Sequence, residues 1–273
     1  MSSGVIMGQY YPAESLVHAM DPRAKLLIAV TFMVVLFIGN NFYAFAIMGA
    51  FAFLAILLSK VPVRLLIRGL RPIVFIMAFT LLLHLFLTPG PAIFKVGPVT
   101  ATWSGLIQGA FIGVRLVILI MFTSLLTLTT SPIELTDGLE DVLKPFRRLG
   151  VPAHELAMMM TIALRFIPTL LEEAERIMKA QMARGADFES GNMMKRAKSL
   201  IPLLVPLFVS AFRRADDLAM AMEARCYRGG EGRTRMRQLR MAFRDYAAFG
   251  LILVTAALVI VVRIKFGPVI SRL

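Results

Sequence analysis

Two arginines, Arg184 and Arg225, stand at the ends of two stretches of sequence that repeat each other. A guanidinium group is planar and forms paired hydrogen bonds with a carboxylate, which suits an acidic groove on another protein. The alternative is that both cations only complement the partial negative charge of helix carboxyl ends. The repetition favours partner binding. The aligned pairs are Ala174 with Ala215, Glu175 with Asp216, Ile177 with Leu218, Ala180 with Ala221, Ala183 with Ala224, and Arg184 with Arg225.

Long helices are needed to present these two arginines. We expect a first arm over residues 153–184, bent at Pro168 and ended by Gly185, since glycine enters the left-handed conformation easily. We expect a second arm over residues 193–225, with prolines in its apolar middle. Apolar residues of the first arm recur at three- and four-residue steps, which predicts one continuous helical face. They are Leu156, Met159, Met160, Ala163, Ile167, Leu170, Leu171, Ala174 and Ile177.

Composition identifies a membrane protein. The 273 residues are 58% hydrophobic and have a mean hydropathy of +0.75, above the apolar content of an ordinary soluble domain. The net charge of +13 fits the Lys and Arg excess of cytoplasmic loops, so we expect no nucleic acid partner. The single cysteine, Cys226, excludes an internal disulfide. No basic start with a cleavage site precedes the first apolar run, so we expect no removable signal peptide.

Apolar runs predict about five transmembrane helices, at residues 22–38, 42–58, 72–87, 105–129 and 246–264. Asp21 and Pro22 should start the first helix, Ser104 should cap the fourth, and residues 94–103 should form a hairpin. A basic loop around Pro62 and Pro72 marks the cytoplasmic side, so the charge-rich region after residue 131 is cytoplasmic too. Residues 133–149 should form a helix closed by Gly150.

Other residues that could carry chemistry are few. Arg115 lies inside the fourth predicted span, where a charged side chain is costly, so it is a functional candidate. The alternative is that its side chain snorkels to the membrane surface or pairs with a loop carbonyl. We interpret His84 as a packing histidine and the methionines of the arms as core. The chain has no Walker-type phosphate loop and no Cys/His cluster with metal spacing. A membrane enzyme would need an acid/base set, and Glu134, Asp137, Glu140 and Asp141 fit a solvated helix face better.

Three motifs resemble the transmembrane coupling subunit family of energy-coupling factor (ECF) transporters (EcfT, related to CbiQ), which are ABC-type vitamin importers. They are Gln181-Met182-Ala183-Arg184-Gly185-Ala186-Asp187, Ala224-Arg225-Cys226-Tyr227-Arg228-Gly229 and Met20-Asp21-Pro22-Arg23-Ala24-Lys25, and the resemblance covers nearly the whole chain. It departs from the family at Cys226, where glycine is common. Cysteine is less tolerant of left-handed backbone than glycine, so the second arm is expected to end differently or to bind less tightly.

The resemblance implies an all-α membrane protein with a membrane domain at residues 1–130, a cytoplasmic coupling domain at 131–244 and a last transmembrane helix at 245–273. It implies no enzymatic activity and no cofactor in this chain, with ATP and Mg bound by two partner ABC ATPases at the bacterial cell membrane. The implied ATPase-docking residues are Ala183, Arg184, Gly185, Ala224, Arg225 and Cys226. An integral membrane substrate-binding subunit is expected to contact Met159, Met160, Leu170, Leu171 and Met178.

The alternative reading is a self-sufficient membrane transporter or channel, with Arg115 and His84 lining the path. Such a protein would move solute alone in liposomes, which a coupling subunit should not do. The paired arginine-tipped arms favour the coupling subunit. Which vitamin or metal is carried lies outside this chain, because the resemblance assigns substrate binding to another subunit.

Overall fold

The structure is a computed structural model that describes residues 10–96, 99–188, 192–229 and 239–267. Its contacts divide the chain into two compact units. The first, here called the bundle unit, comprises residues 8–139 and 238–273, and the second, the arm unit, comprises residues 140–237. Each unit is described by itself, and helix α5 crosses the boundary between them.

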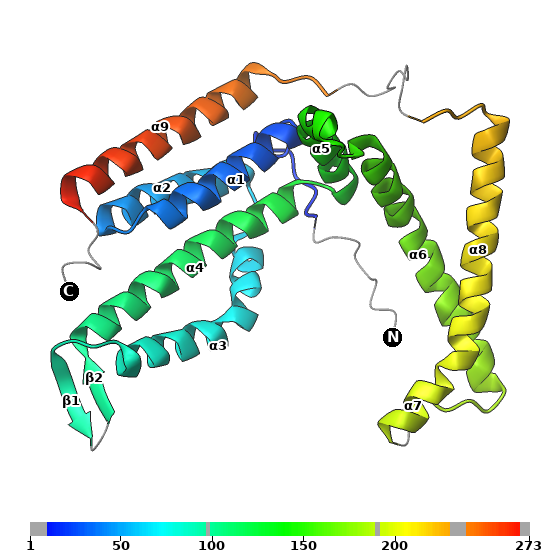
Figure 1. Cartoon of the computed structure of the whole chain (residues 1–273), viewed down its shortest axis with the longest axis horizontal. Coiled ribbons are helices and arrows are strands. Elements are labelled where there is room, and N and C mark those ends of the chain that lie inside the picture. Colours follow the sequence, from blue (N-terminus) through cyan, green and yellow to red (C-terminus); the bar gives the residue numbers. More distant parts are fainter. Residues whose placement is uncertain (1–9, 97–98, 189–191, 230–238, 268–273) are drawn as a thin grey trace. The chain divides into compact units, whose positions relative to one another are not determined.

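The bundle unit is built from five long helices and one small hairpin in its described residues (Figure 1). The first two helices and the hairpin confirm the sequence prediction. The strands pair antiparallel, with Val96 opposite Val99. The elements are α1 (Pro22–Ile38), α2 (Phe42–Ser59), α3 (Val63–Leu87), β1 (Ala92–Val96), β2 (Val99–Thr102), α4 (Trp103–Thr129) and α9 (Phe243–Phe266).

Two helix starts differ from the sequence prediction. Helix α3 begins at Val63 and continues through Pro72 instead of starting there, so three arginines expected in a loop lie on its first turns. Helix α4 is capped by Thr102, whose hydroxyl accepts from the Gly105 N–H at 3.1 Å, and not by Ser104. The reason is local: strand β2 runs directly into α4, which leaves Thr102 as the last extended residue.

The core of the bundle unit lies where α1, α2, α4 and α9 meet. Phe32 is fully buried and stacks on Phe122, with ring centroids 3.9 Å apart. Helices α3 and α4 approach closely because of glycine: a Cβ built on Gly105 would lie 2.2 Å from the His84 carbonyl oxygen. One turn on, a Cβ at Gly109 would meet Leu81. Small residues at four-residue spacing allow such packing in membrane helices.

Five described helices are long and apolar enough to cross a membrane by length and composition: α2, α3, α4, α9 and α6 (Ala153–Ala183). The number agrees with the sequence prediction, but the set does not. Helix α1, with 17 residues, is shorter than the five, although it packs inside the bundle. Helix α6 is the least apolar of the five.

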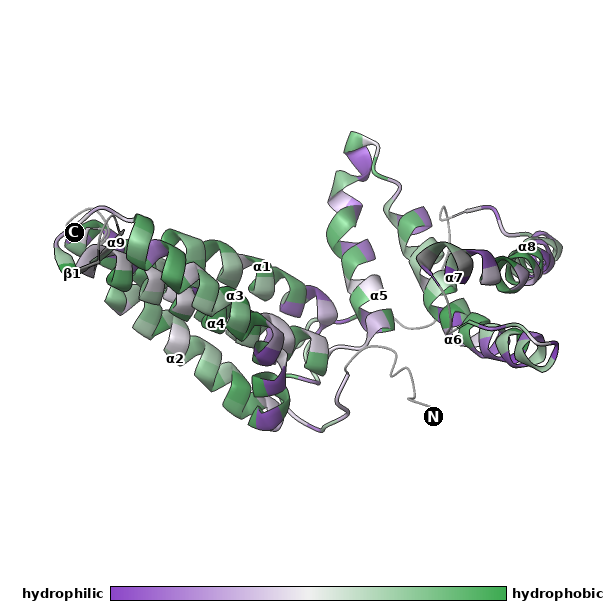
Figure 2. Ribbon diagram, turned by 90° about the horizontal axis from the view of Figure 1, so that it is seen from below, coloured by the Kyte–Doolittle hydropathy of each residue, from purple (hydrophilic) through white to green (hydrophobic). Residues whose placement is uncertain are grey.

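The remaining described helices lie in the arm unit, except for the part of α5 before residue 140, which belongs to the bundle unit. The predicted helix over residues 133–149 consists of α5 (Pro132–Leu143) and a 3₁₀ segment, η1 (Lys144–Leu149), that ends at Gly150 with φ +86°. The second arm is two helices, α7 (Met193–Ser199) and α8 (Ile201–Ala224), and not the single helix expected. Pro202 explains the break, since proline favours the first positions of a new helix. Figure 2 shows polar residues mixed with apolar ones along α6 and α8.

Candidate partner-docking site

The first arm, α6, ends in a Schellman motif around Arg184. The N–H of Gly185 donates to the Met182 carbonyl at 2.9 Å, and the N–H of Ala186 donates to the Gln181 carbonyl at 2.9 Å. Gly185 has φ +88°, the left-handed backbone that this motif requires. The chain therefore turns away from the helix axis directly after Arg184, which leaves the arginine on the helix end.

The second arm ends in the same motif, although its left-handed position is a cysteine. Cys226 has φ +55°. Its N–H donates to the Glu223 carbonyl at 2.8 Å, and the N–H of Tyr227 donates to the Met222 carbonyl at 3.0 Å. The expectation that Cys226 would make the second arm end differently is therefore wrong. The two backbone hydrogen bonds and the free space outside the helix end accommodate the left-handed cysteine.

The two tips, defined as Ala183, Arg184 and Gly185 and as Ala224, Arg225 and Cys226, are exposed. Within the described residues, neither the Arg184 nor the Arg225 side chain makes a hydrogen bond or an ion pair. Each guanidinium stands beside the partial negative charge of its helix end, which stabilises it there. Neither tip folds back onto the arm unit, so both donors remain available to a partner.

The two tips lie at opposite ends of an antiparallel helix pair, as Figure 1 shows for α6 and α8. The pair is joined near its middle by an ion pair between Arg214 Nη2 and Glu173 Oε2 at 2.7 Å. Ser210 also hydrogen-bonds the Glu173 carboxylate. At about 1.5 Å per residue, the 24 residues of α8 separate its two ends by roughly 36 Å. The arm pair therefore presents its two tips at well-separated points.

The second tip has an anchor that sequence reasoning missed. The hydroxyl of Tyr227 lies 3.3 Å from His154 Nε2 and 2.9 Å from Met158 Sδ, both on the first turns of α6. His154 Nδ1 in turn lies 3.1 Å from Glu140 Oε1. Glu140 is only 8% exposed, so its assignment to a solvated helix face is wrong. The sequence signal for this contact is the position of Tyr227 directly after the second tip, where the hydroxyl of a tyrosine can reach the neighbouring helix.

The predicted apolar contact surface of the first arm is only partly exposed. Met159 and Met160 are exposed, as is Leu171, whereas Leu170 and Met178 are half-buried. Sequence reasoning missed a second apolar stripe on α8, although its three- and four-residue spacing is visible in the sequence. That stripe consists of Ile201, Leu204, Val205, Phe208 and Phe212, all exposed in the arm unit.

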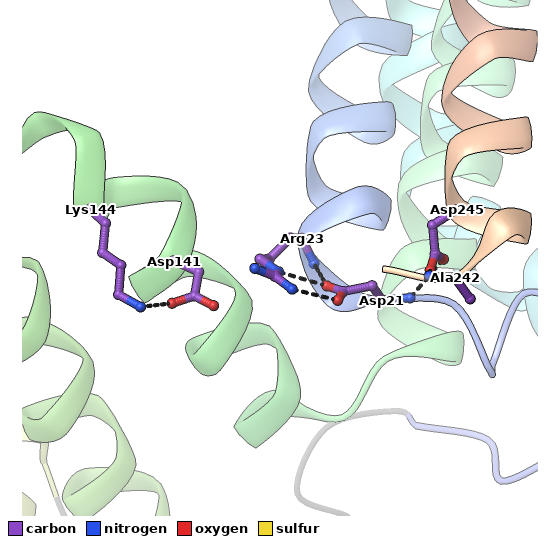
Figure 3. Close-up of polar contacts among 6 residues, drawn as sticks. All are labelled: Asp21, Arg23, Asp141, Lys144, Ala242 and Asp245. Atoms are coloured by element: carbon purple, nitrogen blue, oxygen red, sulfur yellow. Dashed lines mark hydrogen bonds and ion pairs between the residues drawn. The ribbon is translucent and has the colours of Figure 1, made fainter. Parts of the chain in front are cut away.

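The motif Met20–Lys25, here called the opening motif, connects helices at one end of the bundle unit (Figure 3). The Asp21 carboxylate accepts from the Arg23 N–H and pairs with the Arg23 side chain at 2.9 Å. Burial alone would raise the pKa of Asp21, but the Arg23 hydrogen bonds and the charges of Arg23 and Lys25 hold that pKa below its ordinary value. Asp245 then links α9 to this motif, because its carboxylate accepts from the N–H groups of Asp21 at 2.9 Å and of Ala242 at 2.7 Å.

Lys25 is a structural cation. It is 5% exposed, and its ammonium donates to the Thr129 carbonyl at 2.9 Å and to the His18 carbonyl at 3.2 Å. The Thr130 hydroxyl is a third partner at 3.3 Å. Lys25 therefore ties the start of α1 to the carboxyl end of α4, where a cation is favoured. In the arm unit, Figure 3 shows the ion pair of Lys144 with Asp141, three residues apart on neighbouring turns.

Arg115 is engaged within the bundle unit. Its Nη2 donates to the Gly39 carbonyl at 3.2 Å and to the Asn40 side-chain oxygen, in the turn between α1 and α2. Its guanidinium also lies 5.6 Å from the Phe37 ring centroid and 5.4 Å from that of Phe45. These contacts favour pairing with a loop carbonyl over a role in a solute path. The ring of His84 likewise has a local partner, because its Nδ1 lies 3.3 Å from the hydroxyl of Thr88 at the end of α3.

Comparisons with known proteins agree with the motifs. Residues 13–236 match the family described as CbiQ, cobalt transport protein. The chain belongs to this family. A curated relative from Thermosediminibacter oceani is 61% identical over 90% of this chain and 92% of its own length. Relatives from Clostridium kluyveri and Bacillus subtilis are 54% and 51% identical, over 98% and 96% of this chain and 100% of each relative. All three are named energy-coupling factor transporter transmembrane protein EcfT.

Membership of the CbiQ family extends over both arms and the opening motif, since the match begins before Asp21 and ends after Arg225. The chain is therefore a transmembrane component of an ECF-type transporter family and a multi-pass membrane protein. Among the residues that the structure describes, no group of three or more His, Cys, Asp or Glu side chains could hold a metal ion.

Proposed function

We propose that this chain couples ATP hydrolysis on two partner ATPases to the movement of an integral membrane substrate-binding partner. One observation carries the proposal: two helices of one antiparallel pair end in the same backbone motif, and each presents an arginine without a side-chain partner among the residues that the structure describes. A helix-end arginine needs no such duplication to stabilise its own helix. Two similar tips would allow two similar protein partners to bind, one at each tip.

The chemistry of the tips supports acidic sockets on the ATPases. An arginine in a partly desolvated groove forms charge-assisted, paired hydrogen bonds with a carboxylate. The exposed small residues beside each arginine, Ala183 and Ala224, allow the helix end to approach a groove closely. We infer that each tip docks in one ATPase. ATP and Mg²⁺ are bound by these partners, and the chain itself performs no catalysis.

The exposed apolar surface of the arms supports a second docking role. Met159, Met160 and Leu171 on α6 and the stripe from Ile201 to Phe212 on α8 leave large apolar side chains uncovered. Exposed apolar area of this kind marks an interaction surface. The proposed occupant is the substrate-binding membrane subunit, with Leu170 and Met178 at the edge of the contact.

Transmission follows from the rigidity of the arm pair. Because Glu173 and Arg214 join the helices near their middle, a displacement of one tip turns the pair about this point. Closure of the ATPases around ATP would move the two tips relative to each other and tilt the apolar surface that holds the membrane partner. This arrangement requires the arm unit on the cytoplasmic side of the bacterial cell membrane.

Charge reversal at the tips tests the docking proposal. We expect Arg184→Glu and Arg225→Glu each to weaken association with the ATPase pair by about 2–5 kcal/mol, the cost of disrupting a buried hydrogen-bonded charge pair. The assay is co-purification and titration of the ATPases with detergent-solubilised protein. Arg165→Glu on α6 and Arg213→Glu on α8 are matched exposed controls. If both tip variants retain the ATPases as well as the controls do, the sockets do not exist.

A further inference from the structure

Among the exposed side chains of helix α3, one stripe changes from charged to apolar along its length. The stripe begins with Arg64, Arg68 and Arg71, all exposed, at steps of four and three residues. It continues at the same steps with aromatic and aliphatic side chains. These are Phe75, 77% exposed, Phe79, 54%, Leu82, 53%, and Phe86, 39%.

The opposite side of α3 fixes this orientation. Leu66 is fully buried and packs in a cluster with Val61, Leu125 and Leu128. At 100° per residue, Leu66 lies on the far side of the helix from the three arginines. The arginines therefore point outward because the buried leucine holds the first turns of α3 against α4.

No intramolecular contact in the described part of the chain accounts for the positions of the three arginines. Within the described residues, Arg64, Arg68 and Arg71 make no ion pair and no side-chain hydrogen bond. They also crowd the positive end of the helix, where cations are disfavoured and acidic residues are absent. An external anion would relieve both costs. In Figure 1 the first turns of α3 run at a steep angle to its remainder, which extends below α4 toward the β-hairpin. Pro72 within the helix supplies a cause for this bend.

We propose that this stripe, Arg64–Arg68–Arg71 followed by Phe75–Phe79–Leu82–Phe86, binds an anionic phospholipid. The three guanidinium groups hold the phosphate, and one acyl chain lies along the four apolar side chains. The dimensions agree: the helix rises about 16 Å from Phe75 to Phe86, which is roughly one leaflet of a hydrocarbon core about 30 Å thick. The change from charge to hydrocarbon between Arg71 and Phe75 then lies at the headgroup boundary.

A lipid titration tests this site on the full-length chain purified in detergent. The thermal midpoint is followed while phosphatidylglycerol or phosphatidylcholine of equal chain length is added. We expect phosphatidylglycerol alone to stabilise the wild type. In Arg64→Gln/Arg68→Gln/Arg71→Gln its apparent affinity should fall roughly 100-fold, because each basic residue near an anionic surface contributes about fivefold. The same triple change to lysine should keep most of the affinity, which shows that loss of charge and not misfolding is responsible.

Several outcomes would overturn the proposal. A matched triple variant, Arg148→Gln/Arg165→Gln/Arg213→Gln, removes the same charge elsewhere, and an equal loss of affinity there would assign the effect to net charge. Stabilisation of the wild type by inorganic phosphate or by the deacylated headgroup to the same extent would exclude a lipid site. If the glutamine variant keeps its response to phosphatidylglycerol but loses its partner subunits, the stripe is a protein interface.

Discussion

The Tyr227 hydroxyl lies 3.3 Å from His154 Nε2, which fastens the end of the second arm to the start of the first. At the first tip Ala186 follows Gly185 where Tyr227 follows Cys226, so the tyrosine contact has no counterpart at that position. The two tips thus share a backbone motif but differ in the residue that follows it. A force on the second tip reaches the first turns of α6 through the Tyr227 hydroxyl.

We expect Tyr227→Phe to loosen the second tip selectively. The ring stays, while the hydroxyl contacts with His154 and Met158 are lost, at a net cost of about 0.5–1.5 kcal/mol. Affinity for the ATPase pair should then fall up to about tenfold, measured by titration of the solubilised complex. Tyr246→Phe, at an exposed tyrosine of α9, is the control. An unchanged affinity in Tyr227→Phe would mean that the anchor does not support docking.

The left-handed conformation of Cys226 gives a second prediction. A β-branched residue is strongly disfavoured there, so Cys226→Val should cost about 1–2 kcal/mol locally, while Cys226→Gly should keep the motif. The measurement is hydrogen exchange at the amides of residues 226 and 227, which donate to Glu223 and Met222. Both amides should lose protection in the valine variant. Ala219→Val, inside α8, should leave them protected; equal protection in Cys226→Val would contradict the assigned turn.

Local sequence signals predicted much of the fold. The sequence predicted α1, α2 and the β-hairpin correctly, because local residues such as Asp-Pro, Gly-Asn-Asn and Gly-Pro determine where these elements begin and end. It did not predict the start of α3, because Pro72 is typical of the first turn of a helix. Burial of Leu66 against α4 stabilises the turns before it, and that packing cannot be read from the adjacent sequence.

The two tips were predicted because their sequences repeat. Their shared ending was not predicted, because Cys226 in place of glycine indicated a different end for the second arm, whereas Cys226 adopts the same left-handed backbone as Gly185. The supporting contacts were not predicted. His154 and Tyr227 are 73 positions apart, and Asp21 and Asp245 are 224 apart. Such pairs depend on the path of whole helices, and one sequence gives no sign of which polar residues that path brings together.

The ion pair of Glu173 with Arg214 should contribute modestly to the arm pair. Their side chains are 24% and 38% exposed, and water screens the attraction in partly exposed pairs of this kind. A double-mutant cycle with Glu173→Ala and Arg214→Ala should give a small favourable coupling energy from thermal unfolding. Glu172 and Arg213, both exposed, serve as a control pair whose effects should add. A coupling energy near zero for Glu173 and Arg214 would remove the proposed joint between the helices.

Acid should weaken the bundle unit through Asp21. The pKa of Asp21 is lower in the folded protein than its ordinary value of 3.8, so the unfolded chain binds this proton more readily between the two pKa values. The contribution of Asp21 to stability is therefore present above the ordinary pKa, and it is lost as the pH falls through the folded pKa. Asp21→Asn keeps a helix cap but removes this dependence. Thermal midpoints measured from neutral pH down to pH 3 should fall less steeply in the variant, and parallel curves would exclude Asp21 as the source.

Asp245 should be among the most sensitive polar positions of the bundle unit. It is 2% exposed, and its two oxygens accept from the N–H groups of Asp21 and Ala242. Asp245→Ala leaves two backbone donors without their acceptor, at roughly 1–3 kcal/mol for each buried group. We expect a drop of about 5–15 °C in the thermal midpoint, since about 1 kcal/mol shifts a chain of this size by 2–4 °C. Asp245→Asn keeps one acceptor oxygen and should lose less. Asp217→Ala, which removes an exposed acid on α8, is the control for loss of charge. If the thermal midpoint of Asp245→Ala lies within about a degree of that control, α9 is held to α1 by apolar packing alone.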